Sequence, residues 1–422
     1  MTTNRVIQVN AGVVGPRTAR SRTVQIRLPG DYAHLSPAYL EIAQTYASPL
    51  LFGPPLCDEL MALVQHMFTP EEAALVQYIK SPLGRTARAL AAAACRPLDQ
   101  VEPLLEHLVN HKGVLTGFAV IGKRRYGLLP LMPGAFETVL FCTSMDVLTS
   151  WHHRFAELFT DLYETGFIVD YTQRPVQAVR YLPLAEVTDG HPLALPADRL
   201  EMVLDRHDRF AVGLCQCRLT GHLLGRGCGR PMENCVGFGD VADYVVQQGR
   251  GRRVTKRDVI EIKAEAEAAG LVTWVSEIDV AGRRNGISCS CCGCCCHAMR
   301  TVSEFSAPGM FAPPHFLPQV DLAACTYCAR CARACPMGAI TVDTRNKSYQ
   351  HAAERCIGCG LCALACDRQQ AIEMVPNPDY HKPPQGLSAL LQLAPSYLRN
   401  TWSAWRKRQA NTSDDGREKR RS

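Results

Sequence analysis

The chain repeats one cysteine pattern: CTYCARCARACP at residues 325–336 and CIGCGLCALACD at residues 356–367. Each copy has the spacing C-x2-C-x2-C-x3-C. A loop with cysteines at i, i+3 and i+6 can turn three thiolates toward one bound group, with backbone N–H groups facing the same way. The repeat therefore predicts two thiolate-lined sites in one small domain.

This is the spacing of two-cluster bacterial ferredoxins, and residues 319–376 resemble such a dicluster ferredoxin domain. In that family the fourth cysteine of each copy binds the cluster of the other copy. The resemblance implies one [4Fe-4S] cluster on Cys325, Cys328, Cys331 and Cys366, and a second on Cys356, Cys359, Cys362 and Cys335. Pro336 ends the first copy as in the family, whereas Asp367 takes its place in the second. Zinc is the alternative metal, but zinc sites normally join two C-x2-C knuckles in one tetrahedron.

A second group of cysteines lies upstream. CQCR at residues 215–218 is followed by Cys228 and Cys235 in a glycine-rich loop, and residues 289–297 read CSCCGCCCH. Crowded thiols are an oxidation hazard unless a metal binds them. We expect ten metal ligands here: Cys215, Cys217, Cys228, Cys235, Cys289, Cys291, Cys292, Cys294, Cys295 and Cys296. One or two further iron–sulfur clusters would use them, with zinc or a redox-active dithiol as alternatives.

Residues 210–376 also resemble a broad bacterial family of 4Fe-4S-binding proteins. Its members combine a Cys-x-Cys-Arg motif, a run packed with cysteines and a C-terminal dicluster repeat, as this sequence does. The resemblance implies iron–sulfur chemistry over this whole region and does not specify a reaction.

The composition fits a globular protein of several domains, with 422 residues, 47% hydrophobic and 20% charged. We see no secretory signal and no membrane span, and so expect a cytoplasmic protein. Eighteen of the 21 cysteines fall in the four clusters, as metal ligands in a reducing compartment would. We expect Cys57, Cys95 and Cys142 to be small core residues.

Residues 56–134 have the pattern of a winged helix. Helices are expected at 57–68, from Thr69, at 86–94 and at 99–111, followed by apolar strands at 114–120 and 126–131 around a basic wing. The fourth helix would be the recognition helix, but it carries Asp99, Glu102 and Glu106, which oppose binding to phosphate. Nucleic acid is therefore not a favoured partner, and a structural or protein-docking role is preferred.

The C-terminal tail is basic. Residues 401–422 hold seven basic and three acidic groups, most of the net charge of +6. Leu390, Leu391, Ala394, Leu398, Trp402 and Trp405 recur at helical spacing. An interfacial amphipathic helix making peripheral membrane contact, and a helix packed on the body, stay open as alternatives.

The expected fold is a multi-domain α+β protein: a winged-helix-like N-terminal domain, a mixed α/β middle region, a cysteine-rich module and a ferredoxin-like dicluster repeat. Its regions are an arm (1–55), the winged helix (56–134), a connecting region (135–209), the cysteine-rich region (210–318), the ferredoxin domain (319–376) and the tail (377–422). Strands are expected at the apolar segments 339–342 and 371–375.

The expected function is transfer of single electrons through two [4Fe-4S] clusters, to or from a further cysteine-ligated metal site or a partner oxidoreductase. Two alternatives stay open: a catalytic iron–sulfur reductase subunit with an open upstream cluster, and a redox-sensing winged-helix transcription regulator. We find no Rossmann, Walker A, H-E-x-x-H or G-x-S-x-G motif and assign no catalytic residue. An electron carrier or oxidoreductase subunit is thus favoured over a stand-alone enzyme.

Overall fold

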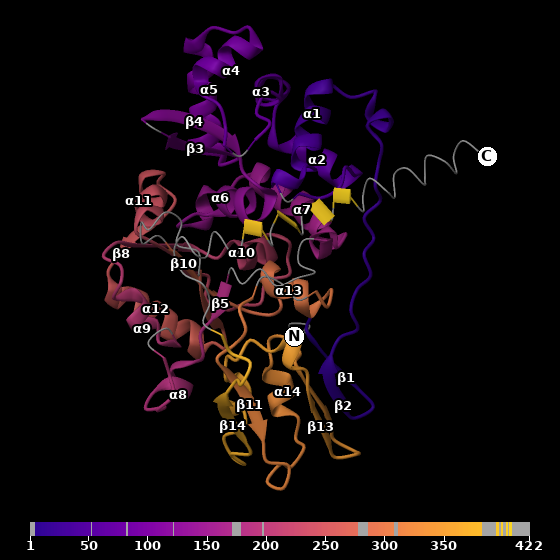
Figure 1. Cartoon of the computed structure of the whole chain (residues 1–422), viewed down its shortest axis with the longest axis vertical. Coiled ribbons are helices and arrows are strands. Elements are labelled where there is room, and N and C mark those ends of the chain that lie inside the picture. The colour runs from indigo at the N-terminus through magenta and orange to yellow at the C-terminus, as the bar shows by residue number, and fades with distance from the viewer. Residues whose placement is uncertain are drawn as a thin grey trace, which may run out of the picture. The chain divides into compact units, whose positions relative to one another are not determined.

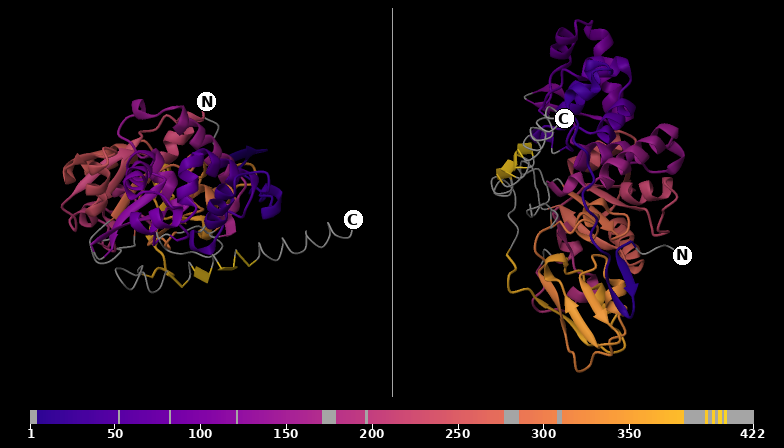
Figure 2. Two further views of the ribbon diagram at one scale, coloured as in Figure 1. Left: turned by 90° about the horizontal axis from the view of Figure 1, so that it is seen from above. Right: turned by 90° about the vertical axis from the view of Figure 1, so that its right-hand side faces the viewer.

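The computed structural model describes residues 5–51, 53–81, 83–120, 122–170, 179–195, 198–276, 286–307 and 311–381, and residues 394–395, 398–399, 402–403 and 405–406. The described residues fall into two compact units. Unit 1 takes those of 1–21, 142–144 and 172–396, and unit 2 those of 22–141, 145–171 and 397–422. Figures 1 and 2 show the elements of both units. Most of the tail pattern at 388–408 lies outside the described residues.

The first sheet of unit 1 joins the N-terminal segment to the cysteine repeat. Its order is β1-β2-β12-β13, with β1 at Ile7–Asn10, β2 at Val13–Pro16, β12 at Ile340–Asp343 and β13 at Ser348–His351. The indigo hairpin of β1 and β2 lies against the orange strands in both figures. Val14 pairs with Val342 across the β2–β12 junction. The expected N-terminal arm did not include this pairing.

The rest of the repeat packs on the same core. β11 (Phe316–Val320) and β14 (Ile372–Pro376) form a two-stranded sheet, and α14 (Arg330–Ala334) and α15 (Leu361–Leu364) follow the two cysteine loops. The strands expected at 339–342 and 371–375 are β12 and β14. The shared core contains Val6, Ile7 and Val14 together with Phe316, Ile340, Val342, Ile372 and Met374.

The larger sheet of unit 1 has the order β5-β9-β10-β7-β6-β8. Its strands are Val179–Tyr181 (β5), Phe210–Leu214 (β6), Glu233–Phe238 (β7), Arg252–Val254 (β8), Val272–Ser276 (β9) and Gly286–Cys291 (β10). The helices of this region are Ala185–Thr188 (α8), Leu200–Leu204 (α9), Gln216–Leu223 (α10), Asp240–Gln247 (α11), Lys256–Ala268 (α12) and His297–Ser303 (α13). Thr255 caps α12 through a reciprocal pair of hydrogen bonds with Asp258, as its sequence predicts.

Unit 2 is mainly helical. Its helices are Pro37–Tyr46 (α1), Asp58–Met67 (α2), Pro70–Val76 (α3), Ala87–Ala94 (α4), Leu98–His107 (α5), Phe136–Leu140 (α6) and Ser150–Glu164 (α7). The antiparallel strands β3 (Leu115–Val120) and β4 (Lys123–Leu128) form a hairpin. Helices α2 to α5 and strand β3 lie close to their expected positions. Strand β4 begins at Lys123, so the basic residues expected in a wing between the strands lie on the strand itself. The winged-helix interpretation itself stays a prediction.

The basic residues of the hairpin are partly engaged within unit 2. Arg124 forms an ion pair with Glu106 of α5, at 2.6 Å, and Tyr126 also donates to this carboxylate. Arg125 donates to the carbonyl oxygens of Leu83 and Gly84. These contacts leave less positive charge for a phosphate backbone than the sequence alone indicates.

The structure also tests the expectations about the three single cysteines and about a membrane-spanning helix. Cys57 and Cys142 are buried, whereas Cys95 is exposed at the end of α4, so the prediction of a core role for Cys95 was wrong. No helix in the described part of the chain is long and apolar enough to cross a membrane.

The N-terminal hairpin should stabilise the dicluster region. Val14 is 1% exposed, and Val14→Ala removes two methyl groups from the shared core. We expect a loss of about 1–2 kcal/mol in the free energy of unfolding, measured by urea titration of the anaerobic holoprotein with cluster absorbance as the signal.

Val9→Ala is the matched control, because Val9 lies on the same hairpin and is 62% exposed. It should change the free energy of unfolding by less than about 0.5 kcal/mol. Equal effects of the two substitutions would show that the hairpin does not share the dicluster core.

Candidate metal centres

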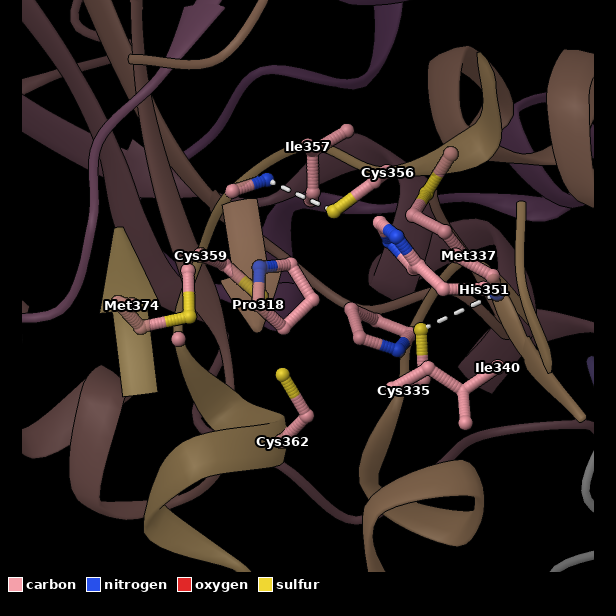
Figure 3. Close-up of a pocket in the computed structure, with 14 residues that line it drawn as sticks. Pro318, Cys335, Met337, Ile340, His351, Cys356, Ile357, Cys359, Cys362 and Met374 are labelled. Atoms are coloured by element: carbon pink, nitrogen blue, oxygen red, sulfur yellow. Dashed lines mark hydrogen bonds between the residues drawn. The ribbon is translucent and has the colours of Figure 1, made fainter. Parts of the chain in front are cut away.

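Two cavities in the cysteine repeat are lined by the two expected quartets. We name the first, with Cys325, Cys328, Cys331 and Cys366, the cluster-one site. The second, with Cys335, Cys356, Cys359 and Cys362, is the cluster-two site, whose four cysteines surround one cavity in Figure 3. Each quartet takes three cysteines from one copy and the fourth from the other. The structure thus brings these residues together in the expected grouping, and their role as ligands stays a prediction.

The two loops share an unusual backbone. Tyr327 and Ala329 in the first copy and Gly358 and Gly360 in the second all have positive φ, between 56° and 87°. The amide of Tyr327 donates to the sulfur of Cys325, and the amide of Gly358 donates to that of Cys356, each at 3.4 Å. Such N–H groups stabilise an anionic iron–sulfur cluster.

The surroundings of the two sites differ. Cys328 in the cluster-one site is exposed, whereas Cys359 and Cys362 in the cluster-two site are buried. Pro318, Ile357 and Met374 line the cluster-two cavity in Figure 3. Cluster one therefore lies nearer to solvent and to any docking protein.

Burial keeps the most enclosed of these thiols protonated when no metal is bound. It raises the pKa of Cys331 to about 11 and that of Cys356 to about 12. Only a bound cation makes a thiolate favourable in such surroundings. Metal binding must therefore release protons at both sites.

The upstream cysteines divide into two sets because side chains alternate along a strand. Cys289 and Cys291 of β10 lie on one face of the sheet, while Ser290 points to the other. Cys289 pairs with Cys235 of β7 and with Trp274 of β9. One row of side chains across the sheet therefore brings together Cys235 and Cys289, two members of the first set.

We name this first set the six-thiol pocket, with Cys215, Cys217, Cys235, Cys289, Cys291 and Cys296. The sulfurs form a continuous network. Cys289 lies within hydrogen-bonding reach of Cys215, Cys235 and Cys291, and Cys296 within reach of Cys217 and Cys291. Hydrogen bonds from Cys215 and its neighbours hold the pKa of Cys289 well below its usual range.

Other side chains also contact these sulfurs. Trp274 Nε1 donates to Cys291 Sγ at 3.2 Å, and His297 Nδ1 lies 3.3 Å from Cys217 Sγ. Tyr181 is also buried. Its pKa is raised, mainly by burial and to a smaller extent by the charges of Cys296, Cys291 and other cysteines. Polar and aromatic groups thus surround the pocket on several sides.

Two buried cations lie beside the six-thiol pocket. Arg218 donates to Ser290 O at 2.8 Å and to Asn234 Oδ1 at 2.5 Å, and Lys263 donates to Asn234 O at 2.9 Å. Among the described residues, neither forms an ion pair with a carboxylate. Burial lowers the pKa of Lys263, whereas the charge of Cys289 raises it. An anionic group in the pocket would neutralise these cations.

The second upstream set is the four-thiol site, formed by Cys228, Cys292, Cys294 and Cys295. All four sulfurs lie within 4.8 Å of one another. Cys228 and Cys292 are 4.0 Å apart, and Cys294 and Cys295 are 3.8 Å apart. Arg230 Nη1 donates to Cys294 Sγ at 3.8 Å. The ten upstream cysteines therefore build two sites.

The upstream run packs directly on the dicluster region. A Cβ atom at Gly293 would collide with the carbonyl oxygen of Pro336, so only glycine allows this approach. Pro336 adjoins Cys335 of the cluster-two site. Arg355, next to Cys356, donates both to Met337 O and to Ser303 O. Two contacts thus join the upstream run and α13 to the cluster-two loops.

Sequence reasoning missed the two buried cations, although one signal for Lys263 was present. Val259, Lys263 and Ala266 are the buried positions of α12 and recur at helical spacing. A lysine in the apolar stripe of a helix indicates a buried charge with an anionic neighbour.

The close fit of the cluster-two loop gives a testable prediction. In Gly358→Ala the new methyl group would meet Phe316 O and Pro314 Cβ at 2.5 Å, and φ is +66°. We expect a loss of about 3 kcal/mol in the free energy of unfolding, because backbone strain and overpacking add. Chemical denaturation of the anaerobic holoprotein measures it.

Gly249→Ala separates the two causes, because Gly249 has φ +65° and no heavy atom within 4 Å of the added carbon. It should lose only about 1 kcal/mol. Similar losses for the two variants would mean that the cluster-two loop is not closely packed.

Comparison with known proteins agrees with the cavities in the repeat. The 4Fe-4S dicluster domain family matches residues 324–378. The electron transport protein HydN of Escherichia coli strain K12 is 34% identical over 112 residues, which are 24% of this chain and 62% of HydN. The HydN proteins of Escherichia coli O6:H1 and O157:H7 match to the same extent.

The chain spans 62% of the length of these curated relatives. No solved structure matches the chain. The family match and the paired cavities concern the same segment. Residues 324–378 are therefore a 4Fe-4S dicluster domain, which implies two [4Fe-4S] clusters in this segment.

Proposed function

We propose that the protein carries single electrons between a redox partner protein at the cluster-one site and a further iron–sulfur cluster in the six-thiol pocket, by way of the cluster-two site. Iron–sulfur clusters supply the one-electron chemistry, and the chain supplies thiolates, N–H···S hydrogen bonds and burial. The contact of Gly293 with Pro336 carries the proposal, because it joins the upstream run to a loop of the cluster-two site.

The exposure of the ligands supports this order. Cys328 gives the cluster-one site an exposed edge where a partner protein can dock. The cluster-two site is more buried and adjoins the upstream run. An electron that enters at cluster one therefore moves toward the interior of unit 1, where the six-thiol pocket lies.

The six-thiol pocket has the properties of a cluster site. A single tetrahedral ion takes four thiolates, and six neighbouring thiols exceed that number. Arg218 and Lys263 favour a net anion there, and an iron–sulfur cluster bound by thiolates is one. Both cations also favour the reduced, more negative state of such a cluster.

Lys263→Met tests the proposal. Because Lys263 is buried beside Cys289, Cys235 and Cys291, its removal should lower the reduction potential of the upstream cluster by roughly 50–100 mV. The potentials of the two dicluster centres should stay within about 20 mV of their original values, because they lie farther from this charge. EPR-monitored redox titration of the anaerobic holoprotein measures all three.

Lys256→Met is the control, since Lys256 lies on the same helix and pairs with Asp205 at the surface. It should leave every potential unchanged. A titration that shows dicluster signals alone, or an upstream potential that is insensitive to Lys263→Met, would contradict the proposal.

A further inference from the structure

The sulfurs of the four-thiol site lie closer together than those of the cluster sites. The pairs Cys228–Cys292 and Cys294–Cys295 are separated by 4.0 and 3.8 Å. Among the described residues, this is the one set of three or more potential ligand atoms that all lie within 4.8 Å of one another. The cluster-one and cluster-two quartets do not meet that criterion, although they belong to the dicluster domain.

Coordination geometry explains the difference. In a tetrahedral site with metal–sulfur distances of about 2.3 Å, the sulfurs are about 3.8 Å apart, because the four ligands share one ion. In a [4Fe-4S] cluster each thiolate binds a different iron atom, which places the sulfurs farther apart. The distances in the four-thiol site match the first case.

We propose that Cys228, Cys292, Cys294 and Cys295 hold one zinc ion. Four thiolates in a closed tetrahedron are a structural zinc site, and zinc has no redox chemistry. The surroundings suit the excess negative charge of such a site. Arg230 donates to Cys294, and Arg218 lies close enough to act on Cys292. Second-shell cations of this kind stabilise thiolate ligands.

The zinc ion would hold the upstream run in place. Cys228 comes from the loop after α10, and the other three ligands surround Gly293. The ion therefore ties that loop to the glycine that packs on Pro336. The neighbouring residues Cys291 and Cys296 belong to the six-thiol pocket, which is a separate set of sulfurs. This assignment is independent of the proposed electron path, because zinc carries no electrons.

Metal analysis of the full chain tests the inference. Protein purified anaerobically without chelators should contain about one zinc per chain in addition to its iron. Zinc K-edge X-ray absorption should show four sulfur ligands at about 2.3 Å. Nitrogen or oxygen in the zinc shell, or zinc below about 0.2 per chain, would overturn the assignment.

Cys228→Ser should reduce zinc to less than about a quarter of its original content and leave the iron content and the dicluster EPR signals unchanged. Cys95→Ser is the matched control, since Cys95 is an exposed cysteine outside the four cysteine clusters. It should retain both metals. A loss of about four iron atoms on Cys228→Ser would instead assign a [4Fe-4S] cluster to this site. X-ray absorption of the unaltered protein decides the matter even where Cys228→Ser fails to fold.

Discussion

A thiol buried in apolar surroundings ionises only beside a cation, and the architecture of unit 1 depends on this constraint. Seventeen of its cysteines are buried or half-buried in the four thiol-lined sites. Without metals Cys331 and Cys356 of the cluster sites hold their protons, because burial raises their pKa. We propose that, with metals bound, the cysteines of the four sites are ligands that join distant segments of the chain. Folding and metal loading of this unit are therefore coupled.

The segments joined in this way are far apart in the sequence. The N-terminal hairpin completes the sheet of the dicluster region through Val14 and Val342. The upstream run reaches the cluster-two loop through Gly293. In both contacts two backbone segments meet directly. The pairing of β2 with β12 requires an open strand edge, and the approach to Pro336 requires a glycine at position 293. Together they make the dicluster domain part of a larger body, whereas a simple ferredoxin would stand alone.

Part of this arrangement follows from local sequence. The spacing of the two C-x2-C-x2-C-x3-C copies predicted the three cysteines that each loop turns toward one site. The resemblance to dicluster ferredoxins implied that the fourth cysteine comes from the other copy. Thr255 and Asp258 have the spacing of a capping box, which accounts locally for the start of α12. The winged-helix and membrane interpretations of the N-terminal region and the tail stay predictions.

Other features could not be obtained from local patterns. Val14 pairs with β12 across more than 300 residues of the sequence. Hydrophobic periodicity reports only local structure, so it does not predict this pairing. Cys289 and Cys291 lie on the same face of the sheet because side chains alternate along a strand. The sequence alone does not show that this segment is a strand, so it did not predict that the upstream cysteines form two sites. The proximity of Arg218 to both upstream sites likewise depends on the fold.

We propose that iron occupies the six-thiol pocket in addition to the dicluster domain. Mössbauer spectroscopy of anaerobic protein enriched in ⁵⁷Fe tests it most directly, because it resolves each iron environment. We expect about eight iron atoms in two [4Fe-4S] clusters and a further set of iron atoms with different Mössbauer parameters. A spectrum in which about eight atoms in dicluster environments account for all the iron would contradict it.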